Sequence, residues 1–176
     1  PVLEWYMRVK IRLEDDYKLF HDLIPEHGVV TDIGCGYGFL AYMLFYLSEG
    51  RTITGIDYDE EKIETANNCF AKTERINFLS GDASEMALQK SDVFIIADVL
   101  HYLTPEKQNT LLKNCVSALN ENGIIIIRDG DRDLKQRHKG TKLTELFSTK
   151  IIGFNKTQNQ LHFISRSEIE EIGRAH

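Results

Sequence analysis

The sequence predicts an α/β fold built on a doubly wound, mostly parallel sheet. Short apolar runs alternate with stretches of helical character, which is typical of such a sheet. The run 93–97 is apolar throughout, as expected for a strand that helices cover on both faces. Three glycines at every second position, Gly34, Gly36 and Gly38, follow the first apolar run directly. Because 176 residues suffice for a full core, we expect a single domain over 1–176.

The expected elements follow one another along the chain. A helix over 2–23 comes first, and Pro25 ends it. The expected strands are 29–33, 52–57, 76–79, 93–97 and 124–127. The expected helices between them are 38–48, 59–71 and 105–119. Thr104 and Pro105 suit the start of the third of these helices, and an Asn122-Gly123 turn precedes the last strand. Ser167 and Glu170 predict a capping box at the start of a final helix.

Five aspartates lie at or near the ends of the five predicted strands: Asp32, Asp57, Asp82, Asp98 and Asp129. In a doubly wound fold, ligands bind at the carboxyl ends of the strands, near the point where the strand order reverses. The glycine turn suits such a site, since glycine tolerates positive φ and lets a ligand lie on the main chain. The start of the next helix favours negative charge. The acid 19 residues after the last glycine of the turn has a suitable offset for binding ribose hydroxyls.

The stretch Val29–Leu40, with its Asp-x-Gly-x-Gly-x-Gly pattern, resembles motif I of the class I S-adenosylmethionine-dependent methyltransferases. The segment 98–103 resembles the family's motif IV, and Ser80-Gly81-Asp82-Ala83 resembles its adenine-binding segment. The resemblance spans all five predicted strands. It implies a Rossmann-like methyltransferase fold with strand order 3-2-1-4-5. It also implies S-adenosyl-L-methionine as the cofactor, with in-line transfer of its methyl group.

The resemblance also implies which residues meet the cofactor. The glycine turn and Asp32 would lie against the methionine part, and Asp57 would bind the ribose. Asp82 would accept a hydrogen bond from the adenine amine, and Asp98 would face cofactor and substrate. In similar enzymes an N-terminal helix, here 1–24 with Tyr6, forms a lid. The full expected cofactor-binding set is Asp32, Gly34, Cys35, Gly36, Gly38, Asp57, Tyr58, Gly81, Asp82, Ala83 and Asp98.

His101 and Asp98 are the expected catalytic residues. His101 lies three residues after Asp98, at the expected mouth of the site, and an unperturbed imidazole titrates near neutral pH. We therefore expect a general base, and the alternative is a structural histidine at a helix start. No metal is expected. Asp129 and Asp131 could join Asp98 in a catechol-type metal site, but their spacing does not require one, and both are expected to be loop residues.

The acceptor is expected to be a small molecule or a carrier-tethered group, methylated on oxygen or on an activated carbon. The chain lacks the Pro-Pro motif that DNA amino-methyltransferases share, which argues against that class. Cytosine C5 methyltransferases need a nucleophilic cysteine, typically after proline. Cys69 and Cys115 each follow asparagine, which argues against that class as well. A net charge of −6 argues against nucleic acid as the main partner. The segment 129–166 carries a net charge of +4. We expect it to form a substrate wall that suits an anionic acceptor or acidic carrier, although a solvated helical face is more common.

Two other classes of function compete with this interpretation. Residues 36–41 also fit the G-x-G-x-x-G/A pattern of an NAD(P)-dependent oxidoreductase. A non-catalytic S-adenosylmethionine-binding module would carry the same cofactor residues as an enzyme. The acid before the first glycine, the additional Gly34 and the pair Gly81-Asp82 favour the methyltransferase over the oxidoreductase.

The remaining expectations concern context. Three cysteines without metal or disulfide spacing fit the cytoplasm, and no apolar run approaches the roughly 20 residues of a membrane span. The family's sheet usually ends with a sixth and a seventh strand, which we expect to be missing here, although 161–164 is a candidate short strand. We therefore expect a domain cut from a longer chain, with an exposed sheet edge that favours a homo-oligomer.

Overall fold

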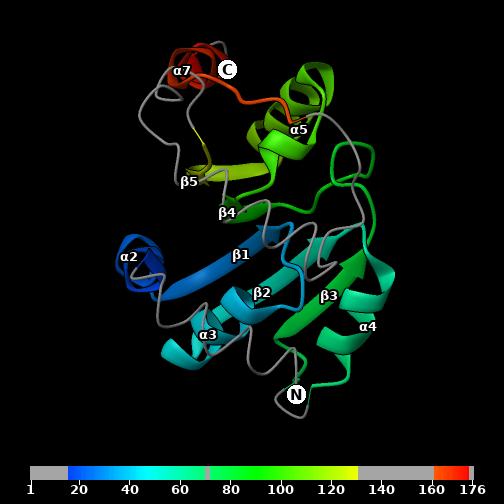
Figure 1. Ribbon diagram of the computed structural model, residues 1–176. Coiled ribbons are helices and arrows are strands. Elements are labelled where there is room, and N and C mark those ends of the chain that lie inside the picture. Colours follow the sequence, from blue (N-terminus) through cyan, green and yellow to red (C-terminus); the bar gives the residue numbers. More distant parts are fainter. Residues whose placement is uncertain (1–15, 70–71, 131–160, 175–176) are drawn as a thin grey trace.

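The computed structural model describes residues 16–69, 72–130 and 161–174, in which helices separate the strands except between the third and the fourth (Figure 1). The elements in chain order are α2 (Asp16–Leu23), β1 (His27–Ile33), α3 (Phe39–Leu47), β2 (Gly50–Asp57), α4 (Glu60–Asn67), β3 (Ile76–Ser80), β4 (Ser91–Ala97), the 3₁₀ turn η1 (Leu100–Tyr102), α5 (Pro105–Ala118), β5 (Leu119–Arg128) and α7 (Arg166–Arg174).

The strands form one parallel sheet in the order β3-β2-β1-β4-β5, which confirms the expected topology. β1 lies at the centre, where Val30 is in register with Ile53 of β2 and with Val93 of β4. The chain passes from β1 outward to β3 and then returns to β4 on the other side. The strand order therefore reverses between β1 and β4, where doubly wound folds bind their ligands.

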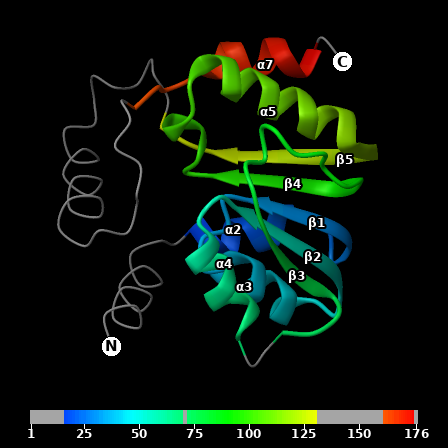
Figure 2. The same cartoon turned by 90° about the vertical axis from the view of Figure 1, so that its right-hand side faces the viewer.

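Helices cover both faces of the sheet (Figure 2). α2, α3 and α4 pack on one face, and α5 and α7 pack on the other. β4 confirms the expectation of a strand buried on both sides, because residues 93–96 are each at most 1% exposed. Burying each of these side chains stabilises the fold by about 1.5–3 kcal/mol. This burial holds the central strands, and hence their carboxyl ends, in a fixed arrangement.

Two element boundaries differ from the expected ones by more than two residues. α4 ends at Asn67 rather than near residue 71, where the Asn67 side chain donates to the backbone carbonyl of Phe78 at 3.0 Å. Asparagine side chains that bond to backbone in this way disfavour the continuation of a helix. β5 begins at Leu119, and its pairing with β4 contains a β-bulge. Asn122 has φ +62° there, so the expected Asn122-Gly123 turn lies inside the strand rather than before it.

The predicted capping box of the last helix is wrong by two residues. The box is formed by Ser165 and Glu168, since Ser165 N–H and Oγ both donate to Glu168 Oε2 at 2.8 Å. The Glu168 N–H in turn donates to Ser165 Oγ at 3.3 Å. The candidate strand at 161–164 is not a strand. It is irregular, and the His162 N–H donates to the carbonyl of His101 at 2.9 Å.

The expected N-terminal helix over 2–23 is confirmed only for α2, because residues 1–15 lie outside the described part of the chain. Most of the expected substrate wall, residues 131–160, lies outside it as well. In the portions of the chain that the structure describes, no helix has the length and apolar character that a membrane crossing requires.

A buried arginine ties helices α2 and α3 to β2. The guanidinium of Arg51, which is 0% exposed, donates to the carbonyls of Pro25 and Ile24 at 2.8 Å and of Leu44 at 3.1 Å. One of its nitrogens also lies 3.2 Å from His21 Nδ1. Leu44 lies in the last turn of α3, whose carbonyls lack partners within the helix, and Ile24 and Pro25 follow α2 directly. Arg51 therefore satisfies backbone groups that would otherwise be buried and unpaired.

We predict that Arg51→Met lowers the free energy of unfolding by about 2–4 kcal/mol, because it leaves several buried carbonyls without a donor. Urea unfolding followed by circular dichroism measures this change. The control is Arg75→Met, which replaces an exposed arginine and should cost less than about 1 kcal/mol. Equal losses in the two variants would show that the Arg51 contacts contribute nothing particular to stability.

Candidate functional site

The loops that follow the strands are fixed to one another at the carboxyl edge of the sheet. After β1, the Gly34 N–H donates to the carbonyl of Ile56 at 2.7 Å. After β3, the Gly81 N–H donates to the carbonyl of Asp57 at 2.9 Å. After β4, the Asp98 N–H donates to the carbonyl of Arg128 at 2.7 Å. Each loop is thus bonded to the neighbouring strand, and the polar side chains on this edge are held in place before any ligand arrives.

The glycines of the turn between β1 and α3 have different roles. All three have positive φ, at +73° for Gly34, +55° for Gly36 and +75° for Gly38. A Cβ on Gly34 would overlap the side chain of Val99, so this glycine allows the loop after β4 to pack on the turn. Apart from Gly36 and its two neighbours in the chain, no described residue has a heavy atom within 4 Å of a Cβ built on Gly36. Gly36 is therefore the place where a ligand can approach the main chain.

Asp57 is held in position by two backbone amides. Its Oδ2 accepts from the Gly36 N–H at 2.8 Å, and its Oδ1 accepts from the Asp59 N–H at 2.9 Å. The side chain is buried beside the exposed Tyr58. A carboxylate with both oxygens oriented by the backbone is ready to accept further hydrogen bonds from hydroxyl groups.

Asp32 is buried at the base of the turn, and Cys35 beside it is partly buried. Burial raises the pKa of the Cys35 thiol well above its usual value, and the charges of Asp32 and Asp57 raise it further. The thiol is therefore protonated at neutral pH and is a poor nucleophile. Its Sγ donates to the carbonyl of Gly36 at 3.7 Å, so Cys35 helps to shape the turn.

Asp82 lies at the end of β3 and has close partners at both carboxylate oxygens. Oδ1 accepts from the Ser84 N–H at 2.9 Å and from the Ser84 Oγ at 2.6 Å. Oδ2 accepts from Lys107 Nζ of α5 at 2.7 Å. These contacts lower the pKa of Asp82 below its usual value, although burial opposes them. Gly81 precedes this carboxylate, and Ala83 follows it with a buried side chain.

Asp98 is half exposed and forms an ion pair with Arg128, which lies at the end of β5. Its backbone has φ +58°, an unusual conformation for a residue other than glycine. The guanidinium of Arg128 also lies over the ring of Phe20 in α2, 5.5 Å from the ring centre. Asp98 thus joins the ends of β4 and β5 through Arg128. Within the described residues, no cluster of three or more histidine, cysteine and acidic side chains could hold a metal ion.

His101 is paired with an acid that the sequence analysis placed in a loop. Its Nδ1 lies 2.7 Å from Asp129 Oδ1, and both side chains are only 4% exposed. The His101 N–H also donates to Asp129 Oδ2 at 3.3 Å. The ring stacks on Phe163 at a centroid distance of 5.6 Å and contacts Tyr102. The imidazole is therefore buried against Asp129 and Phe163, whereas an open position at the mouth of the site was expected.

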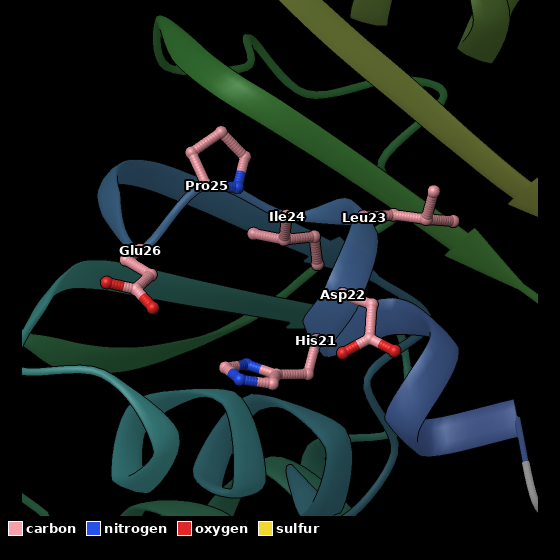
Figure 3. A pocket seen from close by; sticks show the side chains of 6 residues that line it. All are labelled: His21, Asp22, Leu23, Ile24, Pro25 and Glu26. Carbon is pink, nitrogen blue, oxygen red and sulfur yellow. The ribbon is translucent and has the colours of Figure 1, made fainter.

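Two of the hollows in the described part of the molecule differ in their relation to this edge. One, of about 370 Å³, lies between the end of β5 and α7, and Asp129, Gly130 and Ile169 are among its lining residues. The other, of about 470 Å³, is lined by residues 21–26 (Figure 3). This second hollow adjoins the amino end of β1, so it is remote from the carboxyl ends of the strands.

Three contacts at the site were missed from the sequence: those of Asp129, Ser84 and Lys107. Asp129 was found only as a strand-end acid, without its partner. Lys107 carried a usable signal, because a lysine in the first turn of a helix opposes the helix dipole and suggests a nearby acid. Tyr6 and Asp131, which the sequence analysis also considered, lie outside the described residues.

Comparisons with known proteins agree on the fold and on the family. Human acetylserotonin O-methyltransferase is 30% identical over 145 residues, which are 79% of this chain and 41% of that protein. Carboxy-S-adenosyl-L-methionine synthase of Campylobacter lari is 24% identical over 64% of this chain and 48% of that protein. The chain thus spans less than half the length of these relatives.

A similar solved structure is that of human N-acetylserotonin methyltransferase in complex with SAM. It superimposes with a TM-score of 0.68 at 24% identity, covering 92% of this chain and 45% of that one. A family model described as a methyltransferase domain matches residues 24–168, which is most of the chain. The resemblance to the class I S-adenosylmethionine-dependent methyltransferases is therefore confirmed, and the chain belongs to that family of methyltransferase domains.

Proposed function

We propose that this domain binds S-adenosylmethionine at the carboxyl ends of β1 to β4 and transfers its methyl group to an oxygen of a small-molecule acceptor. One observation carries the proposal. One edge of the sheet carries the open backbone at Gly36 and the oriented carboxylates of Asp57 and Asp82. The Gly36 N–H donates to the Asp57 carboxylate, and the loop that carries Asp82 is bonded to the backbone of Asp57. An adenosine offers ribose hydroxyls and an exocyclic amine, which are donors that suit these two acids.

The assigned roles follow the order of the strands. The turn at residues 34–38 would hold the methionine part, with the first amides of α3 favouring its carboxylate. Asp57 would accept from the ribose, and Asp82 would accept from the adenine amine. The bound cofactor supplies a methyl group that its sulfonium already activates. The residues of the chain therefore need only to align the acceptor, exclude water and remove a proton.

His101 is the proposed base, and Asp129 orients it. A carboxylate only accepts hydrogen bonds, so the hydrogen shared at 2.7 Å resides on His101 Nδ1. The basic atom of the neutral ring is then Nε2, and the Asp129 charge stabilises the imidazolium that forms when Nε2 takes a proton. Asp98 would have a supporting role on the side of the site where His101 lies, because its ion pair holds Arg128 at the end of β5.

The acceptor class rests on the relatives. Human acetylserotonin O-methyltransferase and O-methyltransferase 12 of Dictyostelium discoideum, which is 34% identical over 61% of this chain, both carry oxygen methylation in their names. An oxygen acceptor also gives the proposed base a proton to remove. The N-terminal lid over 1–24, the substrate wall over 129–166, an anionic or carrier-bound acceptor, a homo-oligomer and a cytoplasmic location remain proposals.

The first prediction of this proposal concerns the cofactor. Calorimetric titration should show binding of S-adenosylmethionine and S-adenosylhomocysteine but not of NADH. Asp57→Asn should weaken the binding of both sulfur ligands by about tenfold, because an amide is a weaker acceptor for ribose hydroxyls than a carboxylate. Asp22→Asn, at an exposed acid on α2, is the control. Binding of NADH alone would overturn the proposal in favour of an oxidoreductase.

The second prediction concerns the base. With an acceptor panel that includes N-acetylserotonin, His101→Gln should lower kcat by about 10²-fold or more, while S-adenosylhomocysteine binds as before. Asp129→Asn should also lower kcat, by about tenfold or more, because the imidazolium loses its counter-charge.

His27→Gln replaces an exposed histidine at the amino end of β1 and serves as the control. The alternative is that the His101–Asp129 pair only ties η1 to the end of β5. In that case His101→Gln and Asp129→Asn would both melt at lower temperature but keep the turnover number of the wild-type protein. A protein that binds the cofactor and methylates nothing in any variant would be a non-catalytic binding module.

A further inference from the structure

Lys107 connects helix α5 to the acid proposed to bind adenine. It lies in the first turn of α5, and its Nζ is 2.7 Å from Asp82 Oδ2 and 2.7 Å from Glu85 Oε1. The ammonium group therefore bridges two carboxylates of the loop that follows β3. Thr104 begins the same helix, and its Oγ1 accepts from the Lys107 N–H at 3.4 Å. Both the backbone and the side chain of Lys107 are thus held at the helix start.

The contacts around Asp82 leave room for one more donor. An ionised carboxylate has roughly four positions that can accept hydrogen bonds. Ser84 takes two positions on Oδ1, through its N–H at 2.9 Å and its Oγ at 2.6 Å. Lys107 takes one position on Oδ2 at 2.7 Å. One position on Oδ2 is left, and a single N–H of an exocyclic amine would fill it.

The position of Lys107 has an electrostatic cost that its contacts offset. A cation in the first turn of a helix is disfavoured by the helix dipole. The carboxylates of Asp82 and Glu85 compensate, and they raise the pKa of Lys107 above its usual value. In return, the hydrogen bond from Lys107 lowers the pKa of Asp82 against the effect of burial. The contacts with Lys107 and Ser84 therefore also fix the orientation of the Asp82 carboxylate.

We propose that Lys107 is a positioning residue for the adenine site, which it serves by orienting the Asp82 carboxylate toward a 6-amino purine. The inference rests on the proposed function, because it assumes that adenosine binds at this edge. Lys107 would then contribute to cofactor recognition from α5, which covers the opposite face of the sheet from α3 and α4. Lys107 acts through Asp82 and makes the site prefer an amine over a carbonyl at purine position 6.

Titration of Lys107→Met with S-adenosylhomocysteine tests the inference. This ligand carries no net charge at neutral pH, so losing the lysine charge has little direct effect on it. We expect the dissociation constant to rise about two- to fivefold, as for the loss of an exposed ion pair. The inosine analogue, with a carbonyl in place of the amine, should bind wild type and variant equally. Lys107→Arg should restore part of the preference for the amine.

Two further variants test whether Lys107 acts through Asp82 or whether removing any surface lysine of α5 changes the affinity. Lys113→Met removes an exposed lysine six residues further along α5 and should leave both affinities unchanged. In an Asp82→Asn background, Lys107→Met should have no further effect, because the group that it orients is gone. Raising the salt concentration should bring the wild-type affinity toward that of Lys107→Met, since salt screens the ion pair.

The outcomes are distinguishable. If wild type binds no S-adenosylhomocysteine, the proposed function itself fails. If wild type binds and Lys107→Met binds equally well, Lys107 forms only a surface ion pair and the inference is overturned. Tighter binding by Lys107→Met would also overturn it, because the lysine would then compete with the purine for Asp82.

Discussion

The hydrogen bond from the Gly36 N–H to the Asp57 carboxylate, 2.8 Å long, joins the end of β2 to the glycine turn after β1. This bond forms only if the glycine turn passes close to the end of β2, and the positive φ of Gly36 allows the backbone to do so. The same turn bonds to the carbonyl of Ile56, and the loop after β3 bonds to the carbonyl of Asp57. The arrangement of the candidate cofactor site therefore depends on this contact at its centre.

The two halves of the site are built differently. On the β1–β3 side, the acids are held by backbone amides and by short loops, so the cofactor half is already formed. On the β4–β5 side, Asp98 and His101 depend on partners at the end of β5, namely Arg128 and Asp129. Lys107 links the halves, because the helix that carries it follows directly on the turn that carries His101. The proposed cofactor-recognition group and the proposed base thus lie on one segment of chain.

The sequence predicted the parts of this structure that depend on local pattern. The apolar run of β4, the glycine turn and the strand-end position of Asp57 were all predicted, because each follows from periodicity or short spacing. Contacts between distant residues could not be predicted in this way. His101 and Asp129 are 28 residues apart, and Asp82 and Lys107 are 25 apart. The capping box failed for a local reason, since both Ser165 and Ser167 have an acid three residues on.

A crystal structure of the domain with S-adenosylhomocysteine tests the central claim most directly. We expect the ribose hydroxyls within hydrogen-bond distance of Asp57 and the adenine amine on Asp82 Oδ2, with the thioether chain over Gly36. A ligand seated instead in the hollow between β5 and α7, or a purine turned away from Asp82, would rule out this cofactor site.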